Sequence, residues 1–289
     1  MSTALKCPER FLEVRISDLS QNPTLLTLCA GYEAGEWRAV PLANHLFEWL
    51  PEFCLKYSEI VNLGSHNAVR LLKQAARTFY SLEKNTDTRG EIGELLLHVA
   101  IRQDFHTIPF VSKMFFKDFS GYTVKGFDCV HILITRSPEG IEENELWLGE
   151  AKFYKDFDSA LTEAIDSVET HLQHNYLRKE FLTICNKIDE SHPQAKQIRK
   201  LLDVNRSLDT IFSRLVIPIL ITYESDTVKN FTTLCREYQN AIEEETKGLY
   251  AKFCKRFPEI KPTIHLILVP LKVKQSLVDA FNSELERQQ

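Results

Sequence analysis

The residues of this chain best suited to chemistry lie between Gly126 and Tyr154, in two apolar runs that each contain one carboxylate. The first run, GFDCVHILIT, contains Asp128. The second, ELWLGEAKFY, contains Glu150, followed two residues later by Lys152. Side chains two positions apart on a β-strand project from the same face, so Glu150 and Lys152 should lie side by side. Burying an acid and a base among apolar neighbours is costly unless the two groups have partners or a task.

An aspartate, a glutamate and a lysine on neighbouring strands suit phosphodiester hydrolysis assisted by a divalent metal. Carboxylate oxygens are preferred ligands of Mg²⁺ or Mn²⁺, so Asp128 and Glu150 are the predicted metal ligands, with the Ala151 backbone carbonyl as a further candidate. Lys152 is suited either to orienting and deprotonating the attacking water or to stabilising charge on the phosphate. The competing interpretation is a structural salt bridge between Lys152 and one of the two acids.

A helix predicted over residues 90–103 precedes these strands and contributes further acids. It is apolar over most of its circumference, but Glu91, Glu94 and His98 share one narrow polar wedge at i, i+3 and i+7. The wedge is either a solvent-facing stripe or the side of the helix that faces the two strand carboxylates and adds a metal ligand. Glycines beside the two glutamates, including Gly93, would let the helix approach another backbone closely, which favours the second interpretation.

Three histidines are weaker candidates for a site. His171 and His174 form an HxxH pair on the helix predicted over residues 158–173 and just beyond it, but no cysteine or acid follows at zinc-ligand spacing. His131 lies on the strand of Asp128 but alternates to the opposite face, so it is predicted to be a core histidine.

The element order predicts a three-layer α/β fold. From Gly90 onward the pattern is helix, three strands of which the first is at 110–116, helix, a helical insertion at about 176–213, strand, a long helix over about 229–256, strand and helix. The second and third strands, over residues 126–135 and 145–154, are expected to form an antiparallel hairpin. Two later strands, over 215–223 and 263–271, are almost continuously apolar, as in a sheet covered on both faces.

The predicted organisation has two parts. Residues 1–85 form an N-terminal region of strands and helices, and residues 86–289 form the core that carries the candidate site. The predicted fold class is therefore a mixed sheet flanked by helices, with the helical insertion at 176–213.

The charge of the chain is unevenly distributed. The overall net charge is −5, but residues 91–170 have a net charge of −8 and residues 171–215 a net charge of +3. A bound cation would offset part of the acidity around the candidate site. The basic segment is either a solvated helical face, a contact for the DNA backbone or a docking surface for an acidic partner.

Several features favour a cytoplasmic protein. No apolar run approaches the roughly 18 residues that span a bilayer, and the N-terminus lacks the basic-then-apolar layout of a secretory signal. Seven dispersed cysteines without a CxxC pair indicate reduced thiols. The chain also has no P-loop motif, so ATP-driven motion would have to come from a partner.

A helix bearing glutamate, followed by strands with a D…ExK pattern, resembles the PD-(D/E)xK nuclease superfamily, although phenylalanine stands at the proline position, in Phe127-Asp128. The longer strings RGEIGELLLH, GFDCVH and LWLGEAKFY are similar to HamA, the small subunit of the Hachiman antiphage defence system, and the similarity covers roughly residues 40–289.

This resemblance implies a restriction-endonuclease-like core and a DNase that requires Mg²⁺ or Mn²⁺. It also implies a heterodimer with a superfamily 2 helicase, HamB, which restrains the nuclease until it senses aberrant or invading DNA. Motif matching transfers the nuclease triad to Asp128, Glu150 and Lys152, and the helix glutamate to Glu94, with Glu91 as the alternative. Two other possibilities are a catalytically silent nuclease fold that acts as a binding or regulatory subunit, and a nuclease of restriction or repair.

Overall fold

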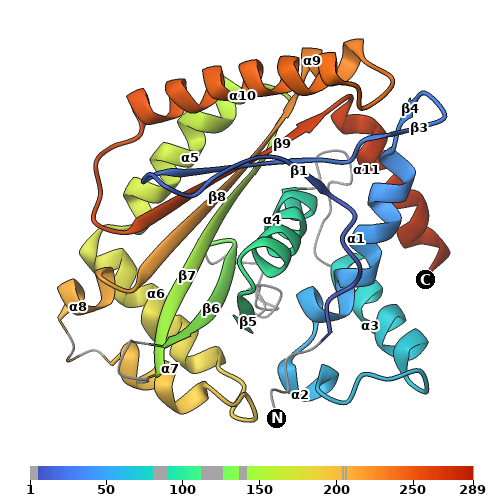
Figure 1. Cartoon of the computed structure of the whole chain (residues 1–289). Coiled ribbons are helices and arrows are strands. Elements are labelled where there is room, and N and C mark those ends of the chain that lie inside the picture. The colour runs from blue at the N-terminus through green and yellow to red at the C-terminus, as the bar shows by residue number, and fades with distance from the viewer. Residues whose placement is uncertain are drawn as a thin grey trace.

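The structure, a computed structural model, describes residues 6–80, 90–111, 126–136, 142–203, 205 and 207–288. Its centre is a mixed β-sheet with helices on both faces (Figure 1). The predicted α/β architecture of a mixed sheet flanked by helices is thereby confirmed.

The strands fall into one large sheet and one small pair. They are Glu13–Asp18 (β1), Thr24–Cys29 (β2), Tyr32–Glu33 (β3), Glu36–Trp37 (β4), Ile108–Val111 (β5), Cys129–Arg136 (β6), Glu142–Phe153 (β7), Leu215–Glu224 (β8) and Thr263–Leu271 (β9). The seven-stranded sheet has the order β1-β2-β9-β8-β7-β6-β5, and β3 pairs with β4. Strands β2, β9, β8 and β7 are mutually parallel, whereas β1, β6 and β5 pair in antiparallel fashion.

The first face of the sheet is covered by helices from the N-terminal half and from the C-terminus. They are Ala39–Cys54 (α1), Tyr57–Ile60 (α2), Ala68–Tyr80 (α3), Gly90–Asp104 (α4) and Lys274–Arg287 (α11). In this layer α4 packs directly on β7 and β8, and α1 packs on α4.

The second face is covered mainly by the helices between β7 and β8, whereas Val228, Tyr238 and Ile242 of two later helices join the core of the first face. The remaining helices are Phe157–His171 (α5), His174–Lys187 (α6), Ala195–Leu201 (α7), Leu208–Phe212 (α8), Asp226–Asn230 (α9) and Arg236–Arg256 (α10). Of these, α5 packs on β7 and β8 opposite to α4. Because both faces of these strands are covered, β8 is buried along its length from Leu215 to Tyr223, as the apolar pattern predicts.

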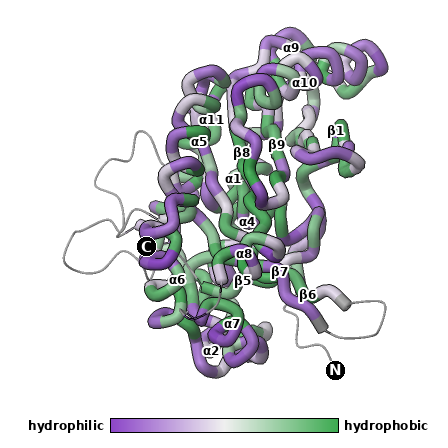
Figure 2. The backbone as a smooth tube through the Cα atoms, turned by 90° about the vertical axis from the view of Figure 1, so that its left-hand side faces the viewer, coloured by the Kyte–Doolittle hydropathy of each residue, from purple (hydrophilic) through white to green (hydrophobic). Residues whose placement is uncertain are grey.

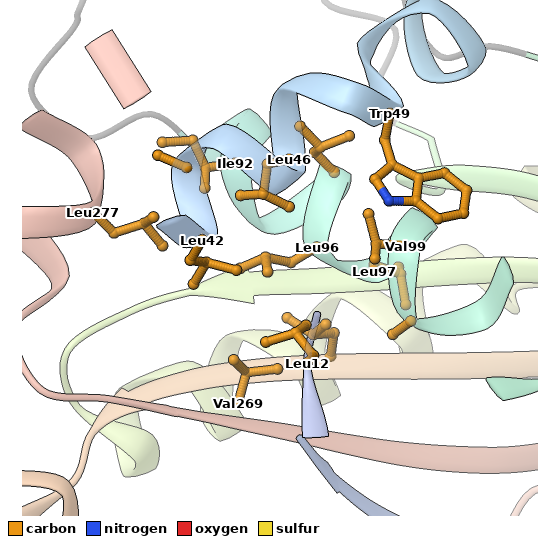
Figure 3. Packing of buried hydrophobic residues seen from close by; sticks show 14 of the residues in the cluster. Leu12, Leu42, Leu46, Trp49, Ile92, Leu96, Leu97, Val99, Val269 and Leu277 are labelled. Atoms are coloured by element: carbon orange, nitrogen blue, oxygen red, sulfur yellow. The ribbon is translucent and has the colours of Figure 1, made fainter. Parts of the chain in front are cut away.

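Two apolar cores separate the three layers. Figure 2 shows the hydrophobic residues gathered in the interior, around α1 and α4, while α10 at the rim is mostly hydrophilic. In Figure 3, Leu42, Leu46 and Trp49 of α1 point towards Leu96 and Val99 of α4. Burying such large side chains contributes about 1.5–3 kcal/mol each. This packing holds α4 firmly against the sheet and so determines where its polar residues lie.

Some element boundaries differ from the sequence prediction. The strand expected at 110–116 is β5, Ile108–Val111, and residues 112–125 lie outside the described part of the chain. The helix expected over about 229–256 is divided into α9 and α10 by the non-helical residues 231–235, and the Tyr238 N–H at the start of α10 donates to Cys235 Sγ. The predicted boundary near residue 85 also falls in an undescribed segment, residues 81–89, while β1 and β2 extend the same sheet as β9.

Candidate active site

The β6–β7 hairpin brings the two strand carboxylates together. Its register pairs Cys129 with Gly149, so Asp128 lies where β6 begins, directly beside the second half of β7. The Asp128 N–H donates to the Gly149 carbonyl at 2.7 Å, and the Asp128 carboxylate accepts from the Ala151 N–H at 2.8 Å. The aspartate is therefore tied to the backbone between the other two predicted site residues, Glu150 and Lys152.

Glu150 and Lys152 project from the same face, as the strand period predicts. Lys152 Nζ lies 2.7 Å from Glu150 Oε1 and donates to Ser167 Oγ of α5 at 3.0 Å. Glu150 is only 3% exposed, so Lys152 and the other neighbouring side chains, and not bulk water, surround its carboxyl group. The pair is the salt bridge that the structural interpretation requires, and it also places a lysine beside an acid that is a predicted metal ligand.

His171, a weak candidate in the sequence as half of an HxxH pair, lies beside Glu150, a contact that the sequence did not predict. Its Nδ1 atom lies 3.5 Å from Glu150 Oε2, and the residue is 8% exposed. The two histidines of the HxxH pair lie in different surroundings. His171 is the last residue of α5 and is buried, whereas His174 is the first residue of α6 and is exposed. The spacing of apolar residues on α5 contained a signal, since His171 continues the buried line of Ala164 and Val168.

The helix α4 approaches the opposite face of the sheet very closely. A Cβ atom added to Gly93 would lie 2.8 Å from Cβ of Phe153, and one added to Gly149 would lie 2.7 Å from a methyl group of Leu97. The expected role of Gly93 in a close backbone approach is therefore confirmed, and the approach is to β7 directly after Lys152.

The polar wedge of α4 is buried, so its interpretation as a solvent-facing stripe is wrong. Glu91, Glu94 and His98 are 5%, 9% and 2% exposed. His98 lies on the first face of the sheet, between the rings of Trp49 and Phe53 of the helix layer. At His98 the wedge is enclosed by both layers, because this ring contacts Trp49 and Phe53 of α1 and His131 of β6.

His98 belongs to a buried polar chain behind β6. Its Nδ1 atom lies 3.1 Å from Nε2 of His131, whose Nδ1 lies 2.9 Å from the Thr107 hydroxyl. Burial, assisted by the charge of Arg102, holds the pKa of His98 well below its ordinary value, and burial does the same for His131. His131 is thus the core histidine that its place on the strand predicts, and it faces away from Asp128.

The side chains of the site supply oxygen donors for a divalent metal. Among the residues that the structure describes, no three His, Cys, Asp or Glu side chains are grouped closely enough to hold a metal ion. Asp128 and Glu150 supply hard oxygen donors, and Mg²⁺ is commonly held by one or two carboxylates, with water and substrate phosphate as its other ligands. The chemistry of the donor set therefore fits. The Ala151 carbonyl and Glu94 remain predicted ligands, as does Glu91 in place of Glu94.

The basic insertion lies on the site's side of the sheet. Apolar residues of α6, α7 and α8, including Leu177, Phe181 and Ile198, join the core beneath α5. Among its cations, Lys179 and Lys196 are exposed, and Arg199 pairs with Glu190. Arg206 lies outside the described residues.

The fold and site together define the class of this protein: an α/β protein whose mixed sheet presents an aspartate and a Glu-x-Lys pair from two adjacent antiparallel strands. The model of the HamA family matches residues 6–285 of the 289, and the chain belongs to that family. HamA proteins are components of Hachiman antiphage defence, and this chain is therefore a component of that kind. No curated protein is similar enough to this chain to count as a match. No helix in the described segments is long and apolar enough to cross a membrane.

Proposed function

We propose that this chain is the nuclease of a Hachiman defence complex, with a core of the PD-(D/E)xK kind that hydrolyses DNA with Mg²⁺ or Mn²⁺. The observation that supports this most strongly is the hydrogen bond from the Ala151 N–H to the Asp128 carboxylate. It fixes the aspartate beside the Glu-x-Lys pair, which is the juxtaposition that such chemistry needs. A divalent cation bound there would polarise the scissile phosphate and lower the pKa of a bound water.

The side chains of the site have separate tasks in this proposal. Asp128 and Glu150 would hold the cation, and they are brought together by β6–β7 pairing and by the bond from the Asp128 N–H to the Gly149 carbonyl. Lys152 Nζ, held between Glu150 and Ser167, presents a positive charge next to the carboxylates. As an ammonium it would stabilise the negative charge that develops on the phosphate. To accept the proton of the attacking water it would have to be the neutral amine, because an ammonium has no lone pair.

The partner of the nuclease in this proposal is a superfamily 2 helicase of the HamB kind. The chain contains no P-loop motif, so a helicase would supply ATP-dependent sensing of DNA. Its release of the chain would expose the site to DNA. The membership of the HamA family supports a role in defence over a role in restriction or repair.

A second candidate function is a silent nuclease fold that binds a partner without catalysis. The close Lys152–Glu150 pair favours this silent fold, because an ion pair of this kind can have a purely structural role. Uptake of metal separates the two candidates, because a binding subunit has no need of Mg²⁺.

The test combines metal binding with cleavage. The chain, alone and with its helicase, is titrated with Mn²⁺ by calorimetry and incubated with linear and plasmid DNA, with and without ATP and with a chelator as control. We expect Mn²⁺ binding and metal-dependent degradation, both lost in Glu150→Gln. The proposal would be contradicted if the chain binds metal but cleaves no DNA under any of these conditions. It would also be contradicted if the chain neither binds metal nor cleaves DNA.

A further inference from the structure

The helix α5 contacts both members of the Glu-x-Lys pair from a single side. Ser167 and His171 are four residues apart, so they lie one above the other on one face of the helix. Ser167 Oγ accepts from Lys152 Nζ at 3.0 Å, and His171 Nδ1 lies 3.5 Å from Glu150 Oε2. Two side chains that are two residues apart on β7 thus contact two side chains that are four residues apart on α5.

An N-terminal cap and a buried apolar side hold α5 against the sheet. The helix begins at an aspartate cap, in which the Asp156 carboxylate accepts from the Ser159 N–H at 2.8 Å. Its apolar side, including Ala160, Ala164 and Val168, is buried against the sheet. The last turn therefore has little freedom to move away from β7.

Aromatic rings on two sides hold the His171 ring in place. The ring of Tyr176, in α6, stacks on it at a centroid distance of 4.9 Å, and the ring of Phe127, next to Asp128, lies at 4.8 Å. The two rings belong to segments other than α5 and β7, so they restrict the plane of the imidazole independently of its contact with Glu150. A ring needed only to fill space would not have to direct a nitrogen at a buried carboxylate.

We propose that His171 is a positioning residue for Glu150. Lys152 Nζ lies 2.7 Å from one carboxylate oxygen, and His171 Nδ1 lies 3.5 Å from the other, an ion-pair distance longer than a hydrogen bond, so each oxygen has a nitrogen beside it. A carboxylate has about four lone-pair directions, so each oxygen retains a direction for a cation. Residues that orient metal ligands commonly contribute 10- to 100-fold to metal affinity or activity. This inference rests on the proposed metal-dependent function.

Two amide substitutions distinguish positioning from packing. Asparagine places its amide nitrogen near the position of Nδ1, whereas the longer glutamine places it near Nε2. We expect His171→Asn to retain much of the Mn²⁺ affinity and cleavage rate, and His171→Gln and His171→Ala to lower both about 10- to 100-fold. His174→Ala is the matched control, because this histidine is three residues away and exposed.

The measurement is calorimetric Mn²⁺ titration of the full chain, with cleavage at saturating metal and thermal unfolding in parallel. Weaker Mn²⁺ binding in His171→Gln than in His171→Asn, at equal stability, supports the proposal. If wild type binds Mn²⁺ and all three His171 variants bind it equally well, His171 does not position Glu150, and the nuclease proposal stands. If wild type neither binds Mn²⁺ nor cleaves DNA, the nuclease proposal fails and this one fails with it.

Discussion

The carboxylate of Asp128 accepts a hydrogen bond from the backbone N–H of Ala151, the residue between Glu150 and Lys152. The side chain at the start of β6 is thereby fixed relative to the part of β7 that presents the other two groups. The contact joins two strands through a group that is also a predicted metal ligand. It allows the structural and chemical contributions of Asp128 to be separated by experiment.

Asp128→Asn retains an oxygen that can accept from the Ala151 N–H but removes the negative charge. We therefore expect its unfolding free energy to stay within about 1 kcal/mol of wild type, while Mn²⁺ binding and DNA cleavage are lost. Asp128→Ala also leaves the amide without this acceptor and should cost about 1–3 kcal/mol in urea unfolding. Wild-type Mn²⁺ affinity in Asp128→Asn would show that Asp128 is not a ligand.

The close approach of α4 to β7 gives a prediction about stability. In Gly93→Ala the new methyl group would lie 2.8 Å from Phe153 Cβ, so we expect a loss of about 1–3 kcal/mol in unfolding free energy. The matched control is Gly248→Ala in α10, where no atom lies within 4 Å of the added Cβ. That change should stabilise the helix by about 0.5–1 kcal/mol. Equal effects of the two substitutions would mean that α4 does not rest on β7 in this way.

Buried histidines make stability depend on pH below neutrality. Burial lowers the pKa of His45, His192 and His265 to about 4, and the pKa values of His98 and His131 are also lowered. The unfolded chain binds protons at these positions below its ordinary histidine pKa of about 6.5, whereas the folded chain does not. Stability should therefore be complete above pH 6.5 and fall as the pH is lowered from about 6.5 towards 4.

Urea unfolding at a series of pH values checks this. The folded state is favoured at high pH because the unfolded state binds more protons in this range. His265→Asn, which retains a group able to bond Thr24, should reduce the slope, whereas substitution of the exposed His66 should not. A stability profile that is flat between pH 7 and 4.5 would contradict the burial of these rings.

A buried ion pair behind the site gives a further prediction. Arg102 donates to Glu52 at 2.5 Å, with both side chains less than 10% exposed, and burial raises the pKa of Glu52 against the opposing effect of Arg102. Arg102→Met should cost about 3–5 kcal/mol, because it leaves the acid buried without its cation. Adding Glu52→Gln should recover part of that loss in thermal unfolding. A double variant no more stable than Arg102→Met would contradict the direct coupling.

Local periodicity explains what the sequence could predict about the site. The two-residue period of a strand is sufficient to place Glu150 and Lys152 on one face and His131 on the other, and a turn-rich connection is sufficient to predict the β6–β7 hairpin. A helical wheel finds the wedge of Glu91 and Glu94, but it cannot say which face of a sheet the helix will cover. That depends on the packing of α1 over α4.

The contact of His171 with Glu150 could not be predicted for a related reason. The residues are 21 positions apart, and their distance depends on the angle at which α5 crosses β7 and on the rings of Phe127 and Tyr176. Neither follows from the spacing of apolar residues. The sequence therefore identifies the groups on adjacent strands better than the groups that support them from another layer.

The central claim is that Lys152 acts in DNA cleavage, and comparison with a second lysine on the same segment tests it most directly. Lys155 is exposed and lies three residues further along, so Lys155→Ala is a matched control for Lys152→Ala. The measurement is the initial rate of DNA degradation by the helicase complex with Mg²⁺ and ATP. We predict a loss of about 10²- to 10³-fold for Lys152→Ala and a wild-type rate for Lys155→Ala. Equal rates in wild type and Lys152→Ala would contradict the account.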